Sequence, residues 1–447
     1  MKVLLVSSNT ATSPYPVYPL GLSMVAAAAR DAGHGVAFFD FLQSGKSLDA
    51  LTEVLHEERP GVVGVSIRNI DNVNLLHEEK YIQQVKEIVA CVRRESDAMT
   101  VAGGSAFSIL PEKIIETIGA DYGIVGEGEV AFAQLLAEIE ASRKPPKGTI
   151  FRGGAALDPD CIPSAYYHKE LLAKYLEDGS IATVQTKRGC PLNCVYCSYP
   201  ALEGSRLRVR EPGRVVDDVE TLKNEHGANF VFFTDSVFND DQGTYLDVLR
   251  EMKRRDLGVA WSAFLKPSGL TPEVVELMKD TGLKAAELGT DAACDATLKG
   301  QRKSFSWQEV EASSNALMDV GISTAHYFMF GGPGETPETV RKGIENIKRL
   351  RCSAAFVFMG IRILPDTELY DIARQEGVVD ADNDLLEPVY YISPQVDRDW
   401  MEAVLNEAFE SESYILFPPD VLDDKLQLLH KLGHAGALWD LLAPAGR

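Results

Sequence analysis

The stretch RGCPLNCVYC (residues 188–197) places three of the seven cysteines of this 447-residue chain within eight positions. Cys190, Cys194 and Cys197 have the spacing C-x3-C-x2-C, and no fourth cysteine follows at a comparable spacing. Thiolates this close together in one loop can surround a single metal centre. The loop therefore predicts a metal site in which one coordination position is left open.

Three alternatives compete for this loop. A structural zinc site uses four protein ligands, and ordinary iron–sulfur electron carriers use four cysteines. The third alternative is a set of three buried structural cysteines, but thiols this close in one loop rarely stay unused. The three-cysteine pattern favours a centre at which a substrate or cosubstrate completes the coordination.

The length of the chain predicts two or three domains. Its hydrophobic fraction of 45% and charged fraction of 25% are typical of a soluble globular protein. No apolar run approaches the ~18 residues that a membrane span needs. The N-terminal MKVLLVSS runs directly into polar residues, which predicts a first strand and not a signal peptide.

The formal net charge is −22, which argues against a long nucleic-acid groove because phosphate backbones need clustered Lys and Arg. The remaining cysteines are scattered, which is typical of a reducing cytosol and not of a disulfide framework. We therefore expect a cytoplasmic protein. These four cysteines are Cys91, Cys161, Cys294 and Cys352.

The first 145 residues alternate short apolar runs with amphipathic or Ala-rich stretches, which predicts a parallel sheet covered on both faces. Ligands bind such sheets at the carboxyl ends of the strands. The predicted strands cover 2–8, 35–40, 61–67, 99–104 and 121–126, and the predicted helices cover 20–32, 47–58, 75–95, 111–118 and 128–140.

The loops after these strands carry candidate binding residues. Glycines there admit a ligand close to the backbone, or simply make tight turns. No G-x-G-x-x-G follows the first strand, so a dinucleotide is disfavoured. Asn69 or Asn72 is a possible helix cap, which leaves Arg68 unexplained. The candidates are Leu20, Gly21, Ser66, Arg68, Asn69, Gly103, Gly104, Ser105, Gly126, Glu127, Gly128 and Glu129.

From residue 181 the alternation restarts. Six strand–helix units predict an open (βα)6 barrel whose chemistry sits at the carboxyl ends of the strands. Asp235, Asn239 and His326 are pocket candidates near those ends. The predicted strands cover 181–188, 229–235, 259–264, 284–290, 323–331 and 354–364, and the predicted helices cover 212–225, 241–255, 271–281, 306–319, 336–350, 366–376, and, in a tail that closes the barrel, 397–411 and 419–443.

The cysteine motif, with the aromatic Tyr196 before its last cysteine, resembles the signature of radical S-adenosylmethionine (SAM) enzymes. FFTDSVFND, FMFGGPGETPET and LPDTELYDIA are similar to later segments of the same family. ELGTDAACDATLKG is similar to its E-x-G-x-E-S segment, with Asp291 and Ala292 replacing Glu-Ser. PLGL, Gly-Gly and GEGE in the first domain resemble the cobalamin-binding domain of the cobalamin-dependent members.

This resemblance implies an α/β protein with a Rossmann-like cobalamin-binding domain (1–145), a linker (146–180), a partial (βα)6 radical SAM barrel (181–376) and a mostly helical C-terminal region (377–447). It implies three cofactors: a [4Fe-4S] cluster held by the three cysteines, SAM on the fourth iron, and cobalamin. An external electron donor such as flavodoxin or ferredoxin would reduce the cluster. The implied SAM-binding residues are Tyr196, Asp235, Glu287, Gly289, Asp291, Gly331 and Gly332.

The motif D-x-H-x-x-G, whose histidine ligates cobalt in many corrinoid proteins, is absent from the sequence. We therefore expect cobalamin to be bound without a protein histidine. Our hypothesis is a catalytic role for Arg68, which would occupy the space under the cobalt without ligating it, because a cation has no lone pair to donate. The alternative is that Arg68 pairs with a carboxylate such as Asp71.

The reaction implied by the resemblance is methylation of a carbon centre of a small molecule, lipid intermediate or peptide, through methylcobalamin and a 5′-deoxyadenosyl radical. The alternative is a ring contraction, cyclisation or rearrangement without methyl transfer. S-adenosylhomocysteine separates the two, because it forms only when a methyl group is transferred. A non-catalytic carrier would not need the barrel segments at Glu287 and Gly331–Gly332.

Overall fold

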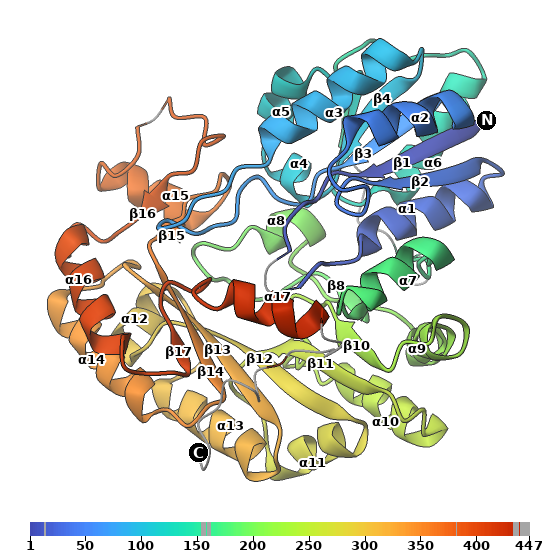
Figure 1. Cartoon of the computed structure of the whole chain (residues 1–447). Helices are drawn as coiled ribbons and strands as arrows, with labels where there is room; N and C mark the ends of the chain where they lie inside the picture. The colour runs from blue at the N-terminus through green and yellow to red at the C-terminus, as the bar shows by residue number, and fades with distance from the viewer. Residues whose placement is uncertain (13–14, 153–157, 159–161, 381, 432–437, 439–447) are drawn as a thin grey trace.

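A computed structural model describes residues 1–12, 15–152, 158, 162–380, 382–431 and 438. The first domain is a six-stranded parallel sheet in the order β2-β1-β3-β4-β5-β6, as predicted for a Rossmann-like fold (Figure 1). Its strands are β1 (Lys2–Ser7), β2 (Gly35–Asp40), β3 (Val62–Ser66), β4 (Met99–Gly103), β5 (Tyr122–Val125) and β6 (Thr149–Arg152), and its helices are α1 (Leu20–Asp31), α2 (Leu48–Glu58), α3 (Ile82–Glu95), α4 (Ser105–Ile109), α5 (Pro111–Ile118) and α6 (Gly128–Glu140).

Two apolar layers enclose this sheet, which explains why its strands are continuous apolar runs. Helices α2, α3 and α5 pack on one face through side chains such as Leu51, Val85 and Ile114. Helices α1 and α6 pack on the other face through Ala26 and Leu135. The carboxyl ends of the strands are left to face the second domain.

The second domain is an open sheet of seven parallel strands in the order β17-β14-β13-β12-β11-β10-β7, which confirms the predicted partial barrel. Its strands are β7 (Ala182–Val184), β10 (Phe230–Phe233), β11 (Ala260–Leu265), β12 (Leu283–Asp291), β13 (Ser323–Phe330), β14 (Ala354–Met359) and β17 (Ile415–Leu416), and its helices are α9 (Pro212–His226), α10 (Tyr245–Arg255), α11 (Pro272–Asp280), α12 (Asp295–Gly300), α13 (Trp307–Asp319), α14 (Pro337–Arg349), α15 (Glu368–Gln375) and α16 (Arg398–Phe409).

The remaining elements join the two sheets. The predicted linker 146–180 contains β6, which extends the first sheet, and α7 (Lys169–Glu177). Helix α8 (Tyr199–Glu203) and the short pair β8 (Lys187–Arg188) and β9 (Arg208–Val209) flank the cysteine loop, and β15 (Ile361–Arg362) pairs with β16 (Tyr390–Tyr391). Helix α17 (Asp423–Lys431) lies between the domains in Figure 1; the rest of the helix predicted over 419–443 mostly falls outside the described residues.

Two predicted elements differ from the structure for local reasons. The strand predicted over 181–188 bends after β7, because the Asp235 carboxylate accepts hydrogen bonds from the backbone of Thr186 and Lys187. The helix predicted over 75–95 begins only at Ile82, because the Asn72 side chain accepts hydrogen bonds from two backbone N–H groups of the preceding loop. Asn72 therefore stabilises a loop and caps no helix. Within the described residues, no helix has the length and apolarity to cross a bilayer.

A buried ion pair connects the two domains. Arg362 Nε lies 2.8 Å from Asp71 Oδ2, and the side chains are only 3% and 2% exposed. Arg362 also donates to the carbonyl oxygens of Ile363 and Leu385, so the guanidinium is well satisfied. The alternative in which Asp71 pairs with Arg68 is therefore wrong, because Asp71 binds an arginine of the second domain.

We expect Arg362→Met to lower the free energy of unfolding by about 3–5 kcal/mol, because it leaves the Asp71 carboxylate buried without a cation. Urea denaturation followed by circular dichroism measures the change. Arg250→Met is the matched control, since Arg250 pairs with Asp247 on the surface, where both side chains are 64% exposed. Equal behaviour of the two variants would contradict this interpretation.

Candidate active site

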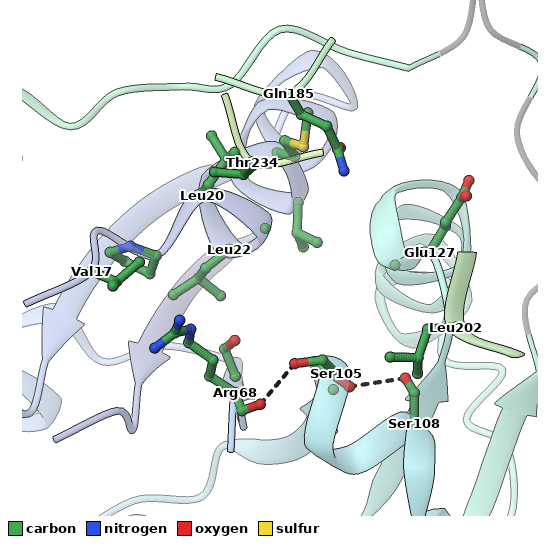
Figure 2. Close-up of a pocket in the computed structure, with 18 of the residues that line it drawn as sticks. Val17, Leu20, Leu22, Arg68, Ser105, Ser108, Glu127, Gln185, Leu202 and Thr234 are labelled. Atoms are coloured by element: carbon green, nitrogen blue, oxygen red, sulfur yellow. Dashed lines mark hydrogen bonds between the residues drawn. The ribbon is translucent and has the colours of Figure 1, made fainter. Parts of the chain in front are cut away.

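One cavity of about 780 Å³ lies where the carboxyl ends of both sheets meet. Figure 2 shows Gln185 and Thr234 of the barrel on one side of it and Arg68 and Ser105 of the first domain on the opposite side. The predicted residues that line it are Leu20, Gly21, Ser66, Arg68, Gly103, Gly104, Ser105, Gly126, Glu127, Gly128, Glu129, Asp235 and Glu287.

The loop after β4 brings bare backbone to this cavity. Gly104 has φ +100°, and a Cβ there would lie 2.5 Å from the carbonyl oxygen of Ile67, so no other residue fits without displacing the backbone. Gly103 beside it makes no such close approach. The Ser105 hydroxyl donates to the carbonyl oxygen of Arg68 at 2.7 Å, which ties the loops after β3 and β4 together.

Arg68 is exposed to the cavity that it lines. Among the described residues, no carboxylate lies within ion-pair distance of its guanidinium. Its charge instead lowers the pKa of nearby tyrosines, although burial raises the pKa of each: Tyr15 and Tyr199 are two of them. Arg68 is thus a cation available to a ligand in the cavity.

The acidic residues of the GEGE motif line the cavity and also form ion pairs with the second domain. Glu129 Oε1 lies 2.5 Å from Arg188 Nη2, and Glu127 Oε2 lies 3.3 Å from Arg188 Nη1. Arg208 also donates to Glu127. These ion pairs cross from α6 of the first domain to β8 and β9 of the second. The predicted cofactor-binding residues Glu127 and Glu129 therefore fasten the cysteine loop to the first domain.

The cysteine loop begins one residue after Arg188. Gly189 has φ +90°, and a Cβ there would lie 2.1 Å from the carbonyl oxygen of Arg206, so the chain can enter the loop only through glycine. Cys190 is buried, whereas Cys194 and Cys197 are half-buried. Burial, followed by repulsion from the other two cysteines, raises the pKa of Cys197 to about 12. The three thiols therefore lie close enough to influence one another's charge.

A buried polar cluster supports this loop. The Tyr196 hydroxyl and the Lys303 ammonium both donate to Asp291 Oδ2. Burial works against the charge of Lys303, but Asp291 and the thiols of Cys194 and Cys197 raise its pKa. Asp291, predicted to bind a cosubstrate, thus already holds a tyrosine of the cysteine motif and a buried cation.

The barrel contributes a second carboxylate to the cavity. Glu287, in the middle of β12, accepts a hydrogen bond from the Tyr327 hydroxyl at 2.9 Å through Oε2. Its Oε1 has no hydrogen-bond partner among the described residues. Burial raises the pKa of Glu287 to about 7, while the bond from Tyr327 lowers it. Glu287 therefore offers an unsatisfied acceptor to the cavity.

Several candidates lie outside the lining of this cavity. His326 is fully buried between Thr290 and Ser314, at 2.8 and 3.0 Å, and burial lowers its pKa to about 3, so it is a neutral structural residue. Asn239 bridges the backbone of Lys266 and Ser268. The other candidates outside the lining are Cys190, Cys194, Cys197, Tyr196, Asn69, Gly289, Asp291, Gly331 and Gly332.

The glycines at 331 and 332 shape a turn. Gly331 N–H donates to Glu335 Oε2 at 2.7 Å, and burial raises the pKa of Glu335 to about 7. A Cβ at Gly332 would lie 2.9 Å from Gln301 Nε2. Gly331 has φ +96°, so the fold favours glycine there, whereas the contact at Gly332 is with the end of a flexible side chain, which can move.

Sequence reasoning missed several residues of the site, among them Arg188, Lys303, Tyr15 and Tyr327. Tyr327 follows His326 directly, so strand alternation places the two side chains on opposite faces, and the face with Tyr327 lines the cavity. Arg188 stands immediately before the cysteine motif, and a charged residue inside a predicted buried strand is a signal that it has a buried partner.

The donor set fits the three groups that the sequence suggests. Three coupled thiols suit an iron–sulfur cluster, the glycine-lined wall of the first domain suits a large planar ligand, and the Glu287 acceptor suits a ligand with a donor group. In the described part of the chain, no three His, Cys, Asp or Glu side chains converge as they would around a single metal ion.

Two family models match the chain. Residues 184–347 match the radical SAM superfamily, and residues 6–136 match the B12 binding domain. The first match covers the cysteine loop and most of the barrel strands, and the second covers the loops that form the opposite wall of the cavity.

Individual proteins resemble most of the chain at low identity. A tryptophan 2-C-methyltransferase of Streptomyces laurentii is 25% identical over 78% of this chain and 71% of its own length. An anaerobic magnesium-protoporphyrin IX monomethyl ester cyclase of Rubrivivax gelatinosus is 25% identical over 69% and 57%. A solved radical SAM methyltransferase from Kitasatospora setae, with cobalamin and a [4Fe-4S] cluster bound, has a TM-score of 0.85 at 24% identity and covers 99% of this chain and 97% of its own; it shows that the fold is shared.

We expect Lys303→Met to shift the reduction potential of an iron–sulfur cluster in the cysteine loop to more negative values, because the buried cation stabilises added negative charge. Each tenfold loss of preference for the reduced state corresponds to ~59 mV. Redox titration of the reconstituted protein, followed by electron paramagnetic resonance, measures the shift. Lys303→Arg retains the charge and serves as the control; an unchanged potential in the methionine variant, at equal iron content, would rule out this role.

Proposed function

We propose that this protein, a cobalamin-dependent radical SAM enzyme, transfers a methyl group to a carbon centre of a small molecule. Its cofactors are a [4Fe-4S] cluster, SAM and cobalamin. The observation that carries the proposal is a cavity of about 780 Å³ that is lined by both the first domain and the barrel. A substrate in it would lie within reach of groups held by either domain.

The cysteine loop and the wall of the cavity would hold different groups. Cys190, Cys194 and Cys197 would hold the cluster, and the wall formed by Gly103 and Gly104 would hold cobalamin. When bound, these groups supply radical initiation and a transferable methyl group, chemistry that the side chains themselves cannot provide. The chain's own contribution is to position these groups and to exclude water.

The Arg188 ion pairs support this positioning role. Because Arg188 is bound to Glu127 and Glu129, the cysteine loop is fixed relative to the wall of the first domain. Arg188 is only 5% exposed, so water does not screen these interactions. Fixed relative positions of two reactive groups are the main way in which a protein accelerates a reaction between them.

Methyltransferases among the relatives support methyl transfer over the alternative. The similarity to a tryptophan 2-C-methyltransferase extends over 78% of the chain. The similarity to a magnesium-protoporphyrin ester cyclase, over 69% of the chain, supports ring formation without methyl transfer as the second candidate. The two functions differ in the fate of the methyl group of SAM.

The products of SAM distinguish the two functions. We expect the anaerobically reconstituted enzyme, reduced in the presence of SAM labelled in its methyl group, to release S-adenosylhomocysteine and to transfer the label to protein-bound corrinoid. Liquid chromatography with mass spectrometry measures both. Cys194→Ala is the control for dependence on the cluster. Turnover to 5′-deoxyadenosine alone, with no S-adenosylhomocysteine, would favour the cyclase-type reaction and reject methyl transfer.

Arg68 is proposed to lie under the cobalt of bound cobalamin and to leave that face without a ligand. We expect Arg68→Ala to admit water or another ligand, which changes the visible absorption spectrum of the bound corrinoid and lowers turnover. Arg68→Lys keeps a charge in a different shape and should give an intermediate result. Unchanged spectra and unchanged turnover in both variants would reject this position for Arg68.

A further inference from the structure

We propose that Glu287 and the aromatic rings around it form a binding site for a protonated amine of the substrate. The assignment of this amine to the substrate rests on the function proposed above. The site itself rests on the geometry of the barrel interior, and its test requires no turnover.

The first observation is the free carboxylate oxygen. Glu287 is 3% exposed and lines the cavity, and only its Oε2 is hydrogen-bonded, by the Tyr327 hydroxyl. Within the described residues Oε1 has no partner. A buried acceptor without a donor is costly. A ligand that brings a donor to this oxygen removes that cost, and a cationic donor removes most of it.

The second observation is the aromatic surface beside this carboxylate. Phe264 pairs with Glu287 in register across β11 and β12. Its ring lies 5.1 Å from that of Phe232 and 6.3 Å from that of Tyr327, and the Tyr327 ring stacks on Phe356 at 5.1 Å. Aromatic rings attract cations and apolar groups. Phe232, Phe264 and Tyr327 line the cavity together with Glu287, and Phe356 supports the Tyr327 ring from behind. A carboxylate beside three such rings suits an ammonium group carried on an apolar or aromatic body.

SAM also carries an ammonium group, so its position matters. Asp291 lies four residues after Glu287, past an irregularity in the pairing of β12 with β13, toward the carboxyl end of the strand. Asp291 contacts Tyr196 of the cysteine motif and raises the pKa of Cys197, although less than burial does. A cosubstrate that completed a cluster on the cysteines would be held at that end, beside Tyr196 and Asp291. Glu287 lies deeper in the barrel, where the other reactant has room.

Burial raises the pKa of Glu287 to about 7, so its charge is expected to change close to neutral pH. Tyr15 and Tyr327 face it, and burial raises the pKa of both well above the usual value of tyrosine, so they stay neutral. Arg68 and Asp235 also line the cavity. Burial raises the pKa of Asp235, while the Lys187 charge and hydrogen bonds from Thr186 and Lys187 lower it. His430 of α17 contacts the ring of Tyr15 at 6.3 Å and is the other group to control for.

The test compares three probes of one shape on the enzyme loaded with cluster and cobalamin: phenethylamine, phenethyl alcohol and hydrocinnamate. Equilibrium dialysis measures their affinities. We expect the amine to bind best, and its affinity to rise from about pH 6 to about pH 8 as Glu287 ionises. Glu287→Gln should weaken amine binding about tenfold, the loss of one charge-assisted hydrogen bond, and leave alcohol binding unchanged.

Two variants assign the pH dependence to its group. Glu287→Gln leaves His430 in place, so a pH dependence that disappears in this variant belongs to Glu287. Tyr327→Phe keeps the carboxylate but removes the hydrogen bond that lowers its pKa; the amine preference should persist, with its midpoint at higher pH. Absorption of cluster and corrinoid confirms that each variant is folded and loaded.

Amine and alcohol of equal affinity in the unmodified enzyme, or an amine preference that survives in Glu287→Gln, would overturn the proposal. Addition of SAM separates the two sources of ammonium: the amine should remain bound beside SAM, and SAM affinity should be unchanged in Glu287→Gln. Displacement of the amine by SAM would assign Glu287 to the cosubstrate and reject the proposal. A lack of S-adenosylhomocysteine in turnover would reject the proposed methyl transfer but not the amine site. The amine site is tested by dialysis, which involves no reaction.

Discussion

The ion pairs of Arg188 are the constraint on which the site depends. One guanidinium, one residue before the cysteine loop, binds Glu127 and Glu129 at the start of α6. Replacing Arg188 would leave the buried Glu129 carboxylate without its counter-ion, which is far more costly than losing a surface pair. The relative position of the two domains at the cavity is therefore set by electrostatics, and apolar packing such as that of Ile361 and Ile363 on the first domain completes it.

The acidic side chains of the site fall into two groups, those paired with a buried cation and those that are not. Glu127, Glu129 and Asp291 are compensated by buried arginine or lysine, and they hold the loops in place. Among the described residues Glu287 has the Tyr327 hydroxyl as its hydrogen-bond partner and no cation, and burial raises its pKa to about 7. This contrast separates carboxylates that build the site from the one that is left to meet a ligand. The net charge of the chain alone says nothing of this division.

The sequence was sufficient to predict the two sheets, because alternation of apolar strands and amphipathic helices needs only local information. It also predicted most of the glycines and the cysteines that flank the cavity. The prediction from sequence failed where the local structure depends on long-range contacts. Asp235 bends the first barrel strand from 49 residues away, and Glu127 binds arginines of the other domain. His326 was singled out in place of Tyr327, since a pattern cannot tell which face of a strand is lined by helices.

The short strand β17 has a consequence for how the protein is made. It pairs with β14, and Leu416 and Leu426 then cover Phe356 and the neighbouring interior of the barrel. These residues leave the ribosome after the other six strands of the barrel have emerged. During synthesis the aromatic interior is therefore exposed for a period in which nascent chains are prone to aggregate.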